Sequence, residues 1–115
     1  MTIPSEILEL VDRLNQELNE TEQELISGLN RVRPLLSIFP NNNLLMGYFS
    51  YFNNVLFFID SSRRRIQATI ETIEPEDIKE ELIQEAGEDL GEQLGRVIEA
   101  KMGVRRIMNT LEELP

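Results

Sequence analysis

The sequence predicts an all-α protein, and two observations lead to that fold class. Apolar residues recur at alternating steps of three and four along three long segments, as they do on the buried face of packed helices. Two groups of helix-breaking residues, "FPNNN" at 39–43 and "EPED" at 74–77, separate these segments. We therefore expect a single helical domain over residues 1–115. It should be an up-down-up bundle of three long antiparallel amphipathic helices, coiled-coil-like and completed as a dimeric helical bundle.

The first helix is predicted over about residues 5–32. Pro34 predicts a bend or a short extra turn beyond it, and Pro40 ends the helical segment. One of the three asparagines at 41–43 should cap the next helix, because an asparagine side chain can accept a hydrogen bond from a free backbone N–H. The seam of the first helix is Ile7, Val11, Leu14, Leu18, Thr21, Leu25, Gly28 and Val32.

The second helix is predicted over about residues 44–73, and its first half is apolar on two sides. A helix of that kind has to be covered on both sides, so this half should lie at the centre of the molecule or of an oligomer. Three helices in so short a chain can bury only part of two aromatic stripes, which favours a self-association face here. The candidate interface residues on this half are Tyr48, Tyr51, Phe52, Val55 and Phe58.

The third helix is predicted over about residues 75–113, with Pro75 in its first turn. Gly87, Gly91 and Gly95 recur every fourth residue and so form one shallow groove along it. If the chain reverses at 74–75, Gly91 lies opposite Phe58, and an intramolecular contact fills the groove. A second copy of the chain could fill it instead, or the glycines could soften a hinge. The three glycines are therefore further candidate interface residues.

Composition removes several classes of function. The chain has 21 acidic and 11 basic residues, no histidine and no cysteine, and a net charge of −10. Thiol catalysis, zinc–thiolate sites and histidine bases are excluded, and no cofactor is expected. The negative charge disfavours direct binding of nucleic acid and of anionic membranes. The longest apolar run, residues 55–59, is too short to span a bilayer, so we expect a cytoplasmic protein.

The one basic cluster is "SSRRRIQ" at 61–67. With a chain reversal at 74–75, its arginines face an acidic stretch of the third helix, which predicts structural ion pairs with Glu81, Glu85, Glu88 and Asp89. A binding site for an anion or a partner is the alternative.

The stretch "EELIQEAGEDLGEQL" is similar to the metal-binding helix of all-α, MazG-like nucleotide pyrophosphohydrolases. This resemblance implies a magnesium-dependent enzyme, because Mg²⁺ prefers hard oxygen ligands such as carboxylates. The ligand candidates by that resemblance are Glu85, Glu88, Asp89, Glu17 and Glu20. A solvated acidic face is the simpler interpretation of the same residues.

"RVRPLLSIFPNNN" followed by "YFNNVLFFIDSSRRRIQ" resembles a group of small uncharacterised bacterial helical proteins, some of them labelled restriction-endonuclease-like. The resemblance implies no mechanism, although an accessory role in a restriction or DNA-processing system would agree with the label. From the residues themselves we expect a non-catalytic scaffold, adaptor or regulatory subunit. It should act as a homodimer and offer an acidic surface to a protein partner that has a basic one.

Overall fold

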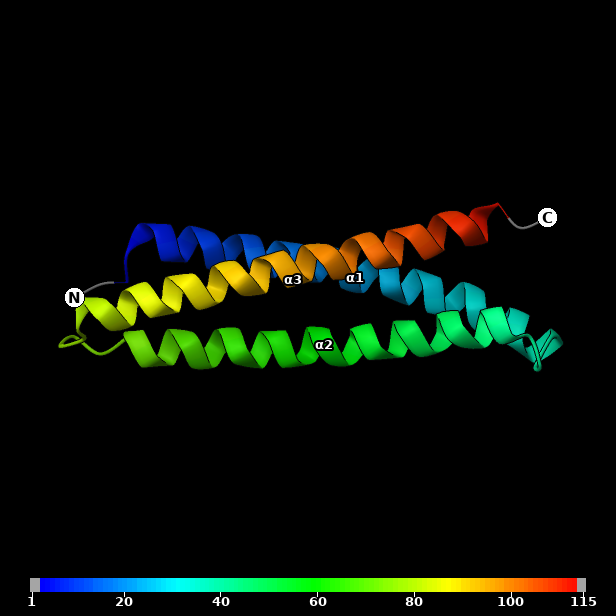
Figure 1. Ribbon diagram of the computed structural model, residues 1–115, viewed down its shortest axis with the longest axis horizontal. Helices are drawn as coiled ribbons and strands as arrows, with labels where there is room; N and C mark the ends of the chain where they lie inside the picture. The colour runs from blue at the N-terminus through cyan, green and yellow to red at the C-terminus, as the bar shows by residue number, and fades with distance from the viewer. Residues whose placement is uncertain (1–2, 114–115) are drawn as a thin grey trace.

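The computed structural model describes residues 3–113 and consists of three long helices (Figure 1). They are α1 (Ser5–Ile38), α2 (Asn43–Ile73) and α3 (Glu80–Glu112). The chain runs up, down and up, so α1 and α3 are parallel and α2 is antiparallel to both. The result is a rod of 59 × 19 × 16 Å. The all-α bundle predicted from the seams is confirmed.

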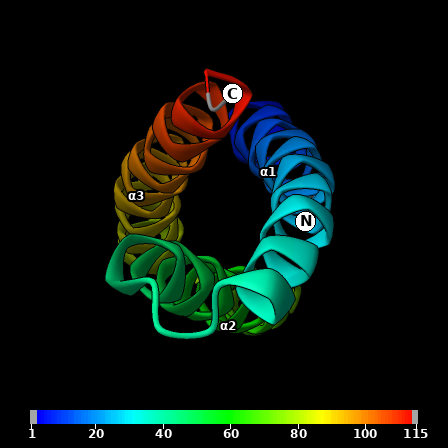
Figure 2. The same cartoon turned by 90° about the vertical axis from the view of Figure 1, so that its right-hand side faces the viewer.

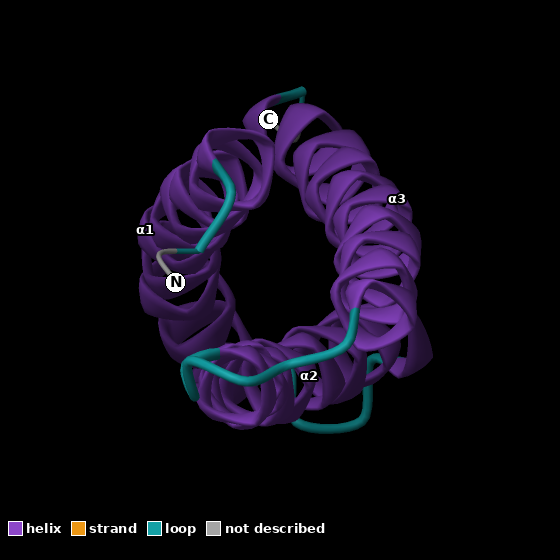
Figure 3. Cartoon of the chain, turned by 90° about the vertical axis from the view of Figure 1, so that its left-hand side faces the viewer, coloured by secondary structure: helices purple, strands orange, loops and turns teal. Residues whose placement is uncertain are grey.

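Viewed from either end, the helices stand around a common centre (Figures 2 and 3). The predicted seams of all three helices meet there, because each presents its apolar stripe inward. Phe52, Ile59, Leu90 and Val97 are at most 1% exposed. The other fully buried side chains include Leu14, Leu18, Leu25, Val32, Val104 and Leu111.

The first loop contains the asparagine cap that the sequence predicts for the second helix. The Asn42 side chain accepts a hydrogen bond from the backbone N–H of Leu45 at 3.0 Å and so caps α2. The preceding helix continues past its predicted end, through Pro34, to Ile38. Leu35 and Leu36 after the proline pack against the core, which stabilises these last turns.

The second loop is longer than predicted. The third helix begins at Glu80 instead of Pro75, and residues 74–79 form the turn. A one-residue connection cannot reverse the chain between helices whose axes lie about 8–10 Å apart. The extra residues shift the register of α3 against α2 by about five positions. Gly103 therefore lies against Tyr51, and the expected pairing of Gly91 with Phe58 is wrong.

Candidate functional site

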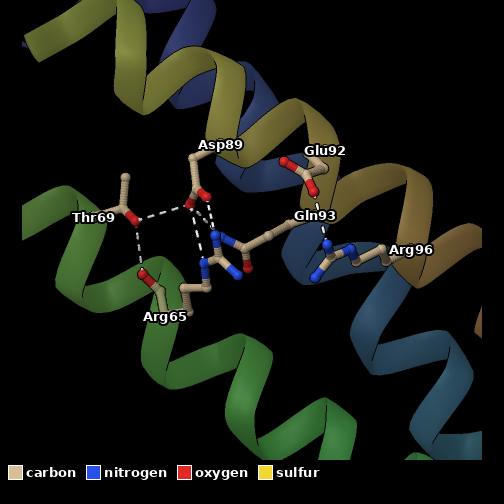
Figure 4. A network of polar contacts seen from close by, with 6 residues as sticks. All are labelled: Arg65, Thr69, Asp89, Glu92, Gln93 and Arg96. Carbon is tan, nitrogen blue, oxygen red and sulfur yellow. Dashed lines mark hydrogen bonds and ion pairs between the residues drawn. The ribbon is translucent and has the colours of Figure 1, made fainter.

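A polar network joins α2 to α3 (Figure 4). Arg65 of α2 forms an ion pair with Asp89 of α3, and Thr69 donates to the same carboxylate at 3.4 Å. The Gln93 side chain donates to Asp89 at 2.8 Å. Burial raises the pKa of Asp89, but the hydrogen bonds from Arg65 and Gln93 outweigh it and the pKa is lowered. Asp89 is therefore held as a carboxylate between the two helices.

A second set of charges joins α1 to α3. Lys101 is 9% exposed and donates to Glu17 at 3.0 Å and to Glu20 at 2.5 Å. These hydrogen bonds raise the pKa of Lys101, and the bond from Lys101 lowers the pKa of Glu20. One turn further along α3, Arg105 donates to Glu24 at 2.9 Å. Because Lys101 is almost buried, separating it from these carboxylates would leave a buried charge without a partner, so the pairs hold α3 against α1.

The carboxylates of the magnesium hypothesis are not brought together. Glu17 and Glu20 bind Lys101, while Asp89 binds Arg65 on another side of α3. Asp89 and Lys101 are twelve residues apart, or about 18 Å along the helix. The remaining two candidates, Glu85 and Glu88, are exposed to solvent. Within residues 3–113, no three carboxylates lie close enough to hold a metal ion.

The arginines of the basic cluster form ion pairs with both neighbouring helices, α1 and α3, whereas partners on α3 alone were expected. Arg65 pairs with Asp89 as expected, but Arg63 pairs with Glu22 of α1 at 2.8 Å. This hydrogen bond lowers the pKa of Glu22 and raises that of Arg63. Arg64 pairs with Asp60 on its own helix. The prediction of structural ion pairs is confirmed. The expected partners at positions 81, 85 and 88 are wrong, because α3 is shifted in register and because Arg63 faces α1 and Arg64 pairs within α2.

The candidate interface residues of α2 divide into two groups. Phe52 is fully buried and Val55 is 5% exposed, so both belong to the core of the folded chain. Phe52 lies inside the bundle, where a second copy of the folded chain cannot reach it, whereas part of Val55 lines a hollow between α2 and α3. The other three, Tyr48, Tyr51 and Phe58, are partly exposed at the edges of the same helix.

The predicted glycine groove is open. At Gly87, Gly91 and Gly95, a Cβ would meet no described atom within 4 Å outside the backbone of α3 itself. No helix within residues 3–113 fills this groove, so the intramolecular contact is wrong, while a groove for a second copy and a glycine-softened hinge both stay predictions.

The glycines that make close contacts are two others. A Cβ at Gly103 would lie 2.0 Å from the Tyr51 hydroxyl, and one at Gly28 would lie 2.7 Å from the Phe52 ring. Gly28 stands in the predicted seam of the first helix, which was a usable signal of a contact. No pattern in the sequence marked Gly103.

The most exposed aromatic side chain of the described residues is not among the candidates predicted from the sequence. Phe57 is 75% exposed on the outer face of α2. Beside it, between α2 and α3, lies a shallow hollow of about 340 Å³. Its lining is formed by Tyr51, Asn54, Val55, Phe58, Arg96, Glu99 and Ala100. Phe57 directly precedes the candidate Phe58, and a helix that is apolar on two sides gives no signal in the sequence to separate the two.

The end of the rod at the first loop is apolar. We call Ile38, Phe39, Leu44 and Met46, which are each at least half exposed, the apolar tip. Here α1 and α2 extend beyond the end of α3, so no third helix covers them (Figure 1). Residues 34–59, which make this tip and most of the first half of α2, contain no charged side chain.

The opposite end is strongly acidic. Residues 69–88, around the second loop, carry eight acidic side chains and one basic one. Residues 5–13, at the start of α1, add three acidic and one basic side chain at the same end. In the other half of the rod, residues 24–57 and 99–113 together carry five basic and four acidic side chains. Most of the net charge of −10 is therefore concentrated at what we call the acidic end.

Comparison of the chain with protein-family models, with curated proteins and with solved structures finds no match. The resemblance to small helical bacterial proteins thus stays a prediction. No helix within residues 3–113 is long and apolar enough to cross a membrane.

Proposed function

We propose that this protein is a non-catalytic interaction module, a rigid rod whose acidic end docks on a basic protein surface. The observation that carries the proposal is the charge distribution. In the middle of the rod, Lys101, Arg63 and Arg65 neutralise carboxylates of the neighbouring helices. The acidic excess around the second loop has only Lys79 to oppose it. An electrostatic field of one sign attracts a partner of the opposite charge and raises the rate at which the two associate.

The same proposal includes a homodimer and a cytoplasmic setting. Support for a dimer comes from the exposed apolar side chains of α2 and the apolar tip, since contiguous apolar surface commonly marks an interface. The cytoplasmic setting is supported by composition alone. A basic partner that itself handles DNA would agree with an accessory role in DNA processing, while the acidic rod would not bind the nucleic acid directly.

The acidic end can be tested with a lysine-rich helical peptide as the probe. We expect the peptide to bind at low salt and to be released at high salt, because salt screens exposed charges. Binding is measured by fluorescence anisotropy of the labelled peptide. A variant that removes three charges from the acidic end should bind it several-fold more weakly: Glu76→Gln, Asp77→Asn and Glu80→Gln, all at exposed positions.

A matched control removes the same number of exposed charges elsewhere on the rod: Asp60→Asn, Glu112→Gln and Glu113→Gln. This control should keep most of the affinity, since it leaves the acidic end intact. Equal losses in the two variants would show that only the total charge matters, and the proposed docking end would be wrong.

A further inference from the structure

Phe57 is the sequence neighbour of Phe58 and lies one turn from Asn54, two of the residues that line the hollow between α2 and α3. The Phe57 ring is 75% exposed, and the hollow of about 340 Å³ is lined by Tyr51, Asn54 and Phe58 of the same helix. A two-fold interface uses one surface on both subunits, so that surface must fit itself. An exposed aromatic ring within two turns of an unfilled hollow meets this requirement.

We propose that a second copy of the chain is the occupant of this surface. Two copies pair antiparallel along α2, and each places its Phe57 in the hollow between α2 and α3 of the other. The inference rests on the homodimer part of the proposed function and names the surface and the orientation.

The outer face of α2 suits a close helix–helix contact. Met46, Ser50, Asn54 and Phe57 are all exposed and follow each other at steps of four, four and three, so they form one stripe. The absence of any charged residue from 34 to 59 means that no like charges meet when two such stripes pack together. The small side chain of Ser50 lets the two backbones approach closely.

The charge distribution favours the antiparallel orientation. A parallel pair would place two acidic ends side by side and repel itself. An antiparallel pair avoids this repulsion, because the acidic end of each copy then lies toward the other end of its partner, where five basic and four acidic side chains nearly balance. That end carries Arg31, Arg33, Arg105 and Arg106. The apolar tips could instead meet end to end, but such a dimer would leave the exposed ring of Phe57 in water.

The hollow fixes the register of the pair. With Phe57 of one copy over Tyr51 of the partner subunit, Asn54 lies beside the two-fold axis and faces Asn54 of the partner subunit. Asn54 is exposed, whereas the neighbouring Asn53 donates to the Phe49 carbonyl of its own helix at 3.0 Å. The Asn54 amide is thus well placed to form a hydrogen bond across the axis.

The first test is the mass of the particle in solution, measured by light scattering at several concentrations. We expect a dimer for the wild type and a twofold lower mass for Phe57→Glu, with the helical circular dichroism unchanged. The matched control is Phe39→Glu, at a tip residue that is 54% exposed. It should remain dimeric. A monomeric wild type, or dissociation by Phe39→Glu and not by Phe57→Glu, would overturn the inference.

The second test uses the absence of cysteine from the chain, which makes single cysteines unambiguous probes. Asn54→Cys should form a disulfide-linked dimer on oxidation, because the residue faces its own copy. Met46→Cys should not, since the antiparallel register separates the two copies of residue 46 by about 24 Å along the helix. A parallel pair would link both variants, and that result would overturn the orientation. Neither test involves the acidic end. If both fail, the proposed dimer surface is wrong, while the peptide-binding experiment still tests the proposed docking function independently.

Discussion

The two halves of α3 contain the same residue types in different environments. In the first half, Gly91 and its two equivalents face open space, and Asp89 makes the one contact with a basic side chain of α2. In the second half, Gly103 is pressed against Tyr51, and Lys101 lies between two carboxylates of α1. The comparison shows that a glycine or a charge has no fixed role in a helix. The residues of the neighbouring helices decide whether a glycine or a charged side chain takes part in helix packing or faces solvent.

The largest effect expected from this comparison is at Gly103. The substitution Gly103→Leu should lower the free energy of unfolding by about 3 kcal/mol, because Tyr51 would have to leave its place between the helices. Chemical denaturation followed by circular dichroism measures the change. The matched control is Gly95→Leu on the open side of the same helix, which should raise the free energy of unfolding by up to about 1 kcal/mol, because leucine is a better helix former than glycine and meets nothing there. Similar losses at both positions would mean that the two glycines are equally covered.

The second largest effect is expected in acid, where the contacts of the second half of α3 should contribute less to the stability of the fold. The bond from Lys101 lowers the pKa of Glu20 in the folded chain below its ordinary value of 4.5. A lowered folded-state pKa contributes stability above the unfolded value, and this contribution is lost as the pH falls through the folded one. Lys101 has a raised pKa, so its contribution is complete at neutral pH and is lost only in alkali, above its ordinary value of 10.5.

We therefore expect the melting temperature to fall as the pH drops below about 4.5, in part because this bond is lost. Glu20→Gln should make the melting temperature less dependent on acid pH, whereas Glu85→Gln, at an exposed position in the first half, should leave the dependence unchanged. Thermal melts across the acid range measure both. If the two variants behaved alike, Lys101 and Glu20 would not be coupled in solution.

Much of the fold could be predicted from the sequence because seams and caps are local patterns. Leu90 and Val97 repeat at a seven-residue interval and are both fully buried, and the asparagine cluster supplied the cap at Asn42. The register between α2 and α3 depends instead on the length of the loop, which no local pattern fixes. Five extra loop residues moved Phe58 away from Gly91. The partners of Arg63 and Arg64 depend instead on which way each residue faces around α2, toward α1 or toward its own helix surface.

The candidate site was harder to predict for a related reason. Phe57 and Phe58 are neighbours in sequence but differ by about 100° around the helix axis. Both are apolar, so hydropathy alone cannot decide which of the two faces water when a helix is apolar on two sides. The same ambiguity placed Phe52 and Val55 at an interface, although the chain buries both in its own core.

The smallest expected effect has the opposite sign and tests whether a second copy packs into the groove of the open glycines. If the groove faces water, Gly91→Ala should raise the free energy of unfolding by about 1 kcal/mol, because alanine is the better helix former and meets nothing there. If a second copy instead packs into the groove, the substitution should raise monomer stability and weaken the dimer. Measuring denaturation and particle mass on the same variant separates these cases. An unchanged dimer with higher stability would leave α2, with its exposed Phe57, as the surface that joins the two copies.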